Sequence, residues 1–150
     1  MREDFNIMEW VQKVQDDKPR IDALVNLLSN YGARTALDEE SHDMASLHYS
    51  VQFLFPDNVV VTIGIILMDY QTSSDVVIET MTTLPQESCS KGFGSRALSC
   101  LLQWVHDNRL REVRATQINN RDSERFWQRN GFVKAPPPSP CNDFIWLRNQ

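Results

Sequence analysis

The sequence predicts an α/β fold with one mixed sheet, in which an antiparallel meander is followed by a βαβ unit and helices flank the strands. Three stretches between residues 47 and 84 have the apolar pattern of consecutive strands. A helical pattern starts at residue 97, and a further strand pattern follows at residues 112–118. The chain has 150 residues, the length of one ordinary domain, and 41% of them are hydrophobic. We therefore predict a single domain over residues 1–150.

The N-terminal region predicts a strand and then a helix. Residues 5–14 suit both strand alternation and helical spacing, and the strand is the interpretation that we favour. The helix begins near Asp16 and Asp17, which are candidate caps, and has Pro19 in its first turn. Gly32 ends this helix. Its apolar face consists of Ile21, Leu24, Val25, Leu28 and Tyr31.

The middle of the chain predicts three strands joined by turns. Residues 34–43 are polar and acidic, which indicates a surface loop or a short irregular helix that can present groups to a substrate. Alternation at residues 47–55 predicts the first strand, and after a turn at residues 56–58 the second strand follows at residues 59–68. A polar turn at residues 71–74 leads to a third strand at residues 76–84, which completes the meander.

The second half predicts the βαβ unit and the last strands. A helix extends to about Asn108, and the strand at residues 112–118 must lie parallel to the strand at residues 76–84 because a helix crosses between them. A short helix at residues 122–130 ends at Gly131, and residues 132–134 and 144–147 supply the last strands. We interpret the proline run at residues 136–140 as a rigid connection rather than as a ligand for an SH3-like module.

The charge balance argues against nucleic acid as a partner. The formal net charge is -5 and the sequence pI is about 5.1, whereas neutralising phosphates requires clustered Lys and Arg. An amine or another cation is a more natural partner, although a modest acidic balance is also ordinary for globular proteins.

Cysteines, histidines and hydropathy argue against several further classes of site. Three cysteines without a C-x-x-C pair fit neither a disulfide framework nor a zinc site, so we expect reduced thiols. His42, His48 and His106 lack metal-ligand spacing, and we interpret them as ordinary histidines. Since no apolar run has the length of a signal or a membrane span, we expect a cytoplasmic protein with no metal and no membrane partner.

The segment 88–96 stands between a predicted strand and a predicted helix. Its glycines, Gly92 and Gly94, let backbone N–H groups turn toward one point, and the helix N-terminus adds partial positive charge. Lys91 and Arg96 can add charge at the rim, which suits a diphosphate better than a carboxylate. A lone G-x-G also fits an ordinary tight turn. The segment lacks the G-K-[ST] of a Walker A loop and the third glycine of a dinucleotide fingerprint.

Two motifs in register resemble the GNAT superfamily of acetyl-CoA-dependent N-acetyltransferases. In that family an apolar residue at a strand end is followed, five positions on, by an Arg/Gln-x-x-G-x-G/A loop, and Leu84 and Cys89 have this spacing. The family's downstream signature is an Asn, a small residue three later, an aromatic seven later and then Gly-Phe. The residues in register are Asn120, Ser123, Trp127, Gly131 and Phe132. The resemblance covers residues 76–134 well and the rest through the order of elements.

The resemblance implies a GNAT-like sheet with splayed parallel strands, which open as a V between residues 76–84 and 112–118. Acetyl-CoA would lie there as co-substrate, with its pantetheine amides on backbone groups of residues 82–84 and its diphosphate on the N–H groups of residues 90–95. Asn120 and the helix at residues 123–127 would face it. The cofactor-binding residues implied are Thr82, Thr83, Leu84, Cys89, Ser90, Lys91, Gly92, Phe93, Gly94, Ser95, Asn120, Ser123 and Trp127.

Two positions depart from the family pattern, and the catalytic base is open. Cys89 stands where the family usually has Arg or Gln, which removes one side chain from the loop but no backbone donor. Trp127 stands where a Tyr often protonates the departing thiolate, and an indole has no hydroxyl; packing beside Phe126 is the interpretation we favour. Glu79 is the carboxylate within the third strand and the candidate catalytic residue. It lies one residue away from the positions where the family resemblance would place a catalytic Glu, which favours a solvent-facing side chain.

The leading functional hypothesis is transfer of an acetyl group from acetyl-CoA to a primary amine of a small molecule or peptide, by direct attack in a ternary complex. Proximity and a strand N–H at the oxyanion would then supply most of the rate. The alternative is a non-catalytic acyl-CoA-binding regulatory module. A toxin-like enzyme acting on charged tRNA is disfavoured because no basic face is indicated. The resemblance also leaves a homodimer open.

Overall fold

The computed structural model describes residues 5–39, 44–116, 118, 120–136 and 142–148. Within these residues, seven strands form one sheet, accompanied by three α-helices and three short 3₁₀-helices. In chain order the elements are α1 (Ile7–Asn26), η1 (Leu27–Tyr31), β1 (Ala33–Leu37), β2 (Leu47–Phe55), η2 (Pro56–Asn58), β3 (Val59–Leu67), β4 (Val76–Leu84), η3 (Gln86–Ser88), α2 (Phe93–Asp107), β5 (Glu112–Ala115), α3 (Arg121–Arg129), β6 (Val133–Lys134) and β7 (Phe144–Leu147).

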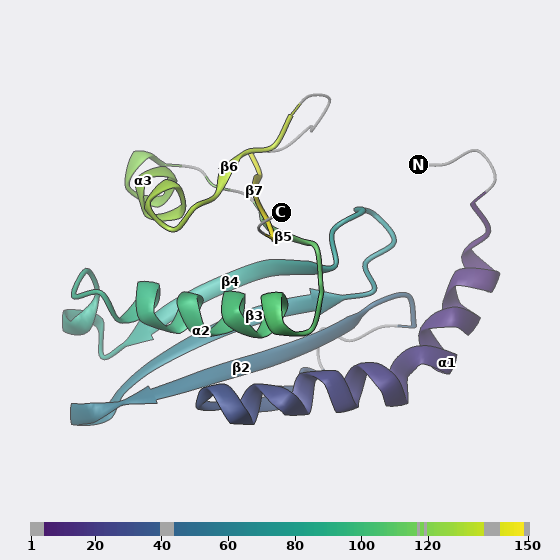
Figure 1. Cartoon of the computed structure of the whole chain (residues 1–150), viewed down its shortest axis with the longest axis horizontal. Helices are drawn as coiled ribbons and strands as arrows, with labels where there is room; N and C mark the ends of the chain where they lie inside the picture. The colour runs from purple at the N-terminus through teal and green to yellow at the C-terminus, as the bar shows by residue number, and fades with distance from the viewer. Residues whose placement is uncertain (1–4, 40–43, 117, 119, 137–141, 149–150) are drawn as a thin grey trace.

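The sheet has the predicted mixed topology. Its strand order is β1-β2-β3-β4-β5-β7-β6, and β1 to β4 form an antiparallel meander. The strands β4 and β5 are parallel and joined through α2, while β7 is antiparallel to both β5 and β6. Figure 1 shows the long strands β2, β3 and β4 running alongside one another, with α3 and β5 to β7 beyond β4. The predicted α/β fold class is confirmed.

The prediction of a strand at residues 5–14 is wrong, because these residues begin α1. The Asn6 side chain caps the helix by accepting hydrogen bonds from the N–H groups of Met8 and Glu9. Val14, on the helical spacing, is buried in the core. The Trp10 indole N–H donates to the Ala45 carbonyl at 2.8 Å, which fixes the first half of the helix to the chain before β2.

The caps predicted for this helix are also wrong. Asp16 and Asp17 lie inside α1, where Gln12 and Lys13 one turn earlier donate to them at 2.9 Å and 3.1 Å. Pro19 lies in the helix interior rather than in the first turn. A proline there removes one backbone hydrogen bond and bends a helix, and α1 is visibly bent in Figure 1.

The segment predicted as a loop at residues 34–43 contains a strand. Residues 33–37 form β1, which pairs antiparallel with β2 from Ala33↔Phe53 to Leu37↔Tyr49. Residues 40–43 and most of the proline run, residues 137–140, lie outside the described residues. The predicted strand at residues 112–118 ends earlier, at Ala115. Gly32 ends the helical segment as predicted, with a φ of 88°, but α1 stops at Asn26 and the last turns before Gly32 form the 3₁₀-helix η1. The helix predicted up to about Asn108 is α2, which ends at Asp107 and already begins at Phe93.

Both long helices cover the same face of the sheet. The Trp104 side chain of α2 is fully buried, and its indole N–H donates to the Leu24 carbonyl of α1 at 3.0 Å. From β2, the Tyr49 hydroxyl donates to Asp22 of α1 at 2.5 Å, and burial together with this bond raises the pKa of the tyrosine. Alternate residues of the strands join them in one hydrophobic core, which includes Leu47, Val51, Phe53, Val61, Ile63, Ile65, Ile78 and Val113.

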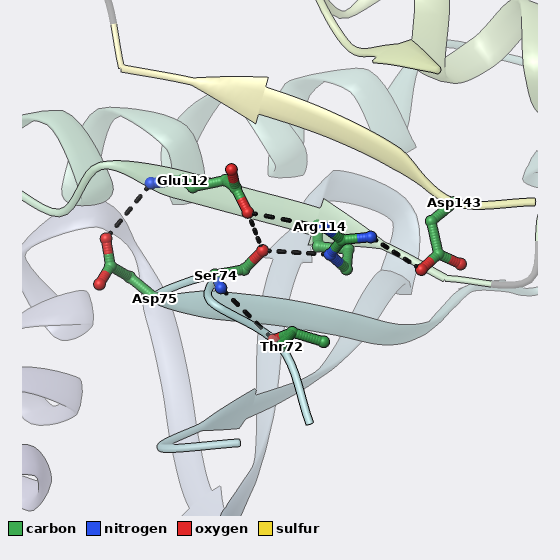
Figure 2. A network of polar contacts seen from close by, with 6 residues as sticks. All are labelled: Thr72, Ser74, Asp75, Glu112, Arg114 and Asp143. Atoms are coloured by element: carbon green, nitrogen blue, oxygen red, sulfur yellow. Dashed lines mark hydrogen bonds and ion pairs between the residues drawn. The ribbon is translucent and has the colours of Figure 1, made fainter. Parts of the chain in front are cut away.

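A network of polar contacts joins the start of β4 to β5 and β7 (Figure 2). The Arg114 guanidinium donates to Asp143 at 3.0 Å and to the Ser74 hydroxyl at 3.2 Å, and it lies 3.9 Å from Glu112. Ser74 also donates to Glu112. Asp75 accepts from the Glu112 N–H at 3.3 Å, so both strands are held together at this end. The Arg114 side chain is only 16% exposed. Its ion pairs are therefore partly buried, and breaking them costs more stability than breaking pairs on the surface.

Candidate functional site

A cleft opens where β4 and β5 separate. Among the described residues, the two parallel strands pair from Val76↔Val113 to Ile78↔Ala115, followed by a backbone bond from the Thr116 N–H to the Ile78 carbonyl at 3.3 Å. Beyond it, β4 continues to Leu84 with pairing to β3 alone. The opening is part of a cleft of about 1170 Å³. The structure thus contains the splayed parallel strands expected from the sequence.

The walls of the cleft come from β4, from the loop before α2 and from α3. Eleven of the residues predicted for the site line it, namely Glu79, Thr82, Thr83, Leu84, Cys89, Ser90, Gly92, Gly94, Ser95, Ser123 and Trp127. Sequence reasoning did not single out several other lining residues, namely Ile78, Thr80, Met81, Gln86, Thr116, Ile118, Asp122, Arg125, Phe126 and Arg129. Helical and strand periodicity place such residues on an element, but they do not reveal which elements separate.

The loop before α2 presents backbone donors to the cleft. Gly92 caps the helix with a φ of 89°, a left-handed conformation that favours glycine, and Ser90 has a φ of 67°. The first intrahelical bond runs from the Arg96 N–H to the Gly92 carbonyl. Among the described residues, no protein acceptor bonds the N–H groups of residues 90–95. These donors and the positive end of the α2 dipole therefore point to an anion site.

The opposite wall is the start of α3. Asn120, predicted as a cofactor-binding residue, is not among the residues that line the cleft; its side chain caps this helix by accepting from the Ser123 N–H at 2.8 Å. The helix approaches the loop closely, because a Cβ added at Gly94 would lie 3.5 Å from the Phe126 ring. The Asn130 amide donates to the Ser95 hydroxyl at 3.2 Å, which ties the far end of α3 to the first turn of α2.

Three residues predicted for the loop or its rim, Lys91, Phe93 and Arg96, are not among the residues that line the cleft. Lys91 is exposed, while the Phe93 ring packs against Phe55 with centroids 5.2 Å apart. The Arg96 guanidinium lies 4.8 Å from the Phe55 ring centroid and 5.6 Å from that of Phe93. This cation–π stacking holds the arginine on the outer side of the loop, so Lys91 is the freer of the two predicted rim charges.

A bulge in β4 places Glu79 on the wall of the cleft. Ile78 pairs with Ile65 and Thr80 pairs with Gly64, so Glu79 is an extra residue with no partner on β3. Its carboxylate lies 3.4 Å from Nδ1 of His48, on β2. The bulge changes the side-chain alternation of β4 by one residue at this position.

The family model for the acetyltransferase (GNAT) family matches residues 14–132 of this chain. The chain belongs to the acetyltransferase (GNAT) family. Solved structures have the same fold, although at identities that show the fold alone. A GNAT-family acetyltransferase from Staphylococcus aureus Mu50 is 12% identical, with a TM-score of 0.52 over 95% of this chain and 91% of the other. No curated protein matches the sequence.

Two further acetyltransferases have this fold. A chimera of the spermidine N-acetyltransferase SpeG from Vibrio cholerae with hSSAT is 14% identical, with a TM-score of 0.51 over 74% of this chain and 72% of the other. Nourseothricin acetyltransferase is 10% identical, with a TM-score of 0.51 over 78% of this chain and 84% of the other.

The two departures from the GNAT pattern both lie in the cleft. The Cys89 thiol is exposed and donates to the Thr83 carbonyl at 3.6 Å, so it joins the loop to the end of β4. The Trp127 side chain is buried, in edge-to-face contact with Phe126 and Phe132 at centroid distances of 5.1 Å and 4.9 Å. Packing is therefore the visible role of the tryptophan at the position where many GNAT proteins have tyrosine.

No group of three or more metal-ligating side chains occurs in the described part of the chain. Within the same residues, no helix has the length and apolar character that crossing a bilayer requires.

Proposed function

We propose that this protein binds acetyl-CoA in the cleft between β4 and α3 and transfers the acetyl group to a primary amine of a small molecule or peptide. The observation that carries the proposal is the set of N–H groups at residues 90–95 that have no acceptor among the described residues, in a loop whose Ser90, Gly92, Gly94 and Ser95 line the cleft at the N-terminus of α2. Membership of the GNAT family supports acetyl transfer in general. The cytoplasmic location and the homodimer stay predictions from the sequence.

The diphosphate of the cofactor would lie at the loop, and its pantetheine arm along β4. Residues 80–84 pair with β3 on one side, and no described strand pairs with their other side, so backbone groups there are available to bond the pantetheine amides. The cleft, at about 1170 Å³, has room for this arm together with an acceptor. Asn120, Ser123 and Trp127 would flank the cofactor from the side of α3, with Trp127 as a packing surface.

The proposed reaction is direct attack in a ternary complex. The amine nitrogen attacks the thioester carbonyl, the C–N bond forms, and the C–S bond breaks to release coenzyme A. Holding both reactants in one cleft supplies the orientation, and a β4 N–H can stabilise the oxyanion. We assign Glu79 as the general base that takes the amine proton, because its carboxylate is 47% exposed and lines the cleft. Water can protonate the thiolate in place of the missing tyrosine.

The test is release of the coenzyme A thiol in the presence of a panel of primary amines. We expect turnover with at least one cationic amine, since the Glu79 carboxylate lines the cleft and the chain has a formal net charge of -5. Thiol release that comes only from hydrolysis of acetyl-CoA, or no thiol release from a protein shown to bind acetyl-CoA, would contradict amine acetylation.

The second candidate function is a regulatory module that binds acyl-CoA without catalysis. The buried Trp127 favours it, because the indole is packed and offers no acid to the leaving group. We expect Trp127→Tyr to raise kcat by roughly 10-fold in an enzyme, the low end of what general acids contribute. Trp127→Phe is the matched control, since it makes the same cavity without the hydroxyl. Binding of acetyl-CoA with no turnover in all three forms would favour the regulatory module.

A further inference from the structure

We propose that His48 is a positioning residue for Glu79: Nδ1 of His48, which already lies against the Glu79 carboxylate, donates to it in the working enzyme and orients the general base, while Ser46 holds the other ring nitrogen. The inference rests on the proposed function, in which Glu79 accepts the amine proton. Sequence reasoning treated His48 as an ordinary histidine, because only the fold brings β2 and the middle of β4 to the same place.

The two nitrogens of the imidazole face two different partners. The hydroxyl of Ser46, a buried residue, lies 2.9 Å from Nε2 of His48. Nδ1 lies 3.4 Å from Oε2 of Glu79. This Nδ1 is buried and has no hydrogen-bond partner among the described residues, so the carboxylate is the polar group in place to satisfy it. The histidine side chain is 13% exposed and the glutamate side chain 47%.

The strand pairing of the sheet brings the side chains of His48 and Glu79 together. His48 pairs with Ile66 of β3, which pairs with Val77 of β4, so apolar residues occupy the next positions across the sheet. The bulge then adds Glu79 to β4 without a partner on β3. An imidazole on β2 is thereby within reach of a carboxylate that also lines the cleft.

The chain of donors has one consistent direction. A neutral imidazole can donate to Glu79 in one tautomer, with the proton on Nδ1, and Nε2 then accepts from the Ser46 hydroxyl. One carboxylate oxygen is then held against the sheet, which turns the other toward the cleft. Such a contact restricts the rotamers of an otherwise half-exposed side chain and keeps the carboxylate in position to accept a proton from the acceptor amine.

Kinetics separate a positioning role from a merely structural one. We expect Glu79→Gln to lower kcat about 100-fold and His48→Ala to lower it about 10-fold, with the KM for acetyl-CoA changed less than about 2-fold in both. The double variant should be no slower than Glu79→Gln, because His48 acts only through the carboxylate. If instead the two losses multiply to about 1000-fold, His48 acts independently of Glu79 and the inference is wrong.

A conservative replacement and a neighbouring control guard against loss of packing. The amide nitrogen of His48→Asn occupies nearly the place of Nδ1, so we expect kcat within about 3-fold of the wild type. Ser50→Ala, two residues along β2 on the same face, should leave kcat unchanged. If kcat falls equally in His48→Asn and His48→Ala, the Nδ1 donor has no role in positioning Glu79.

An NMR measurement tests the pairing without any turnover. In protein labelled with ¹⁵N-histidine, His48 should be the Nδ1-protonated tautomer, and Glu79→Ala should shift its ring signals toward the other tautomer. An Nε2-protonated His48 in the wild type, or a spectrum indifferent to Glu79→Ala, would refute the chain. A protein that passes this test and acetylates no amine would refute the proposed function and leave the pairing in place.

Discussion

Replacing Gly94 by Asp is expected to raise the dissociation constant for acetyl-CoA about 100-fold, or about 2.7 kcal/mol. Gly94 lies in the first turn of α2, lines the cleft and belongs to the loop whose N–H groups are unbonded. A carboxylate there would occupy the place proposed for the diphosphate. The carboxylate would also repel the negatively charged diphosphate in a partly desolvated site, and placing like charges together in an interface costs several kcal/mol of binding free energy.

The fold should tolerate this change. A Cβ at Gly94 would meet its nearest atoms, in Phe126 and Met81, at 3.5 Å and 3.7 Å, which are ordinary contacts. An acidic residue in the first turn of a helix also interacts favourably with the helix dipole. We therefore expect the free energy of unfolding without ligand to be the same or slightly higher.

Isothermal titration with acetyl-CoA measures the effect, and Ser99→Asp is the control. Ser99 is exposed on the same helix, one turn further on, and the substitution changes the net charge by the same amount. Its dissociation constant should stay within about 3-fold of the wild type, because exposed charges at this distance are largely screened. Equal weakening by the two substitutions would mean that net charge, and not the loop, determines affinity.

Replacing Arg114 by Ala is expected to lower the free energy of unfolding by about 3 kcal/mol. The guanidinium lies between Asp143 and Glu112, whose side chains are 10% and 19% exposed, and it also donates to Ser74 (Figure 2). Removing it takes the shared counter-charge from two largely buried carboxylates. The contacts hold together the paired ends of β4 and β5, so the variant should also bind acetyl-CoA more weakly.

Urea denaturation checks this value, with Arg20→Ala as the control. Arg20 lies 3.6 Å from Asp17 but is 65% exposed, and such surface pairs contribute about 0.5 kcal/mol or less. The urea midpoint of the Arg114 variant should fall with an unchanged m-value. A loss no larger than that of the Arg20 variant would show that the network in Figure 2 does not stabilise the sheet.

The sequence predicted the second half of the fold well, for physical reasons. Residues 47–55 alternate in hydropathy because one face of an antiparallel sheet is buried, and the helix after Gly92 has an uninterrupted apolar face. The family resemblance, carried by the glycine spacing and the segment from Asn120 to Phe132, predicted that α3 and the loop before α2 lie at the cleft. Most residues inferred from the family resemblance line it.

The sequence misled where tertiary contacts decide the outcome. Residues 5–14 suit both periods, and the helix forms because Asn6 caps it and Trp10 reaches the Ala45 carbonyl. Residues 33–37 are too few to show alternation, and they become a strand by pairing with β2. The bulge at Glu79 is a mismatch between two strands, so neither strand reveals it alone. The contact between His48 and Glu79 depends on that bulge.

A crystal structure of the protein with acetyl-CoA tests the central claim most directly. The diphosphate oxygens should lie at about 2.9 Å from N–H groups of residues 90–95, with the pantetheine arm between β4 and α3. A cofactor bound elsewhere, or β4 and β5 paired along residues 79–84 so that the cleft is closed, would contradict it.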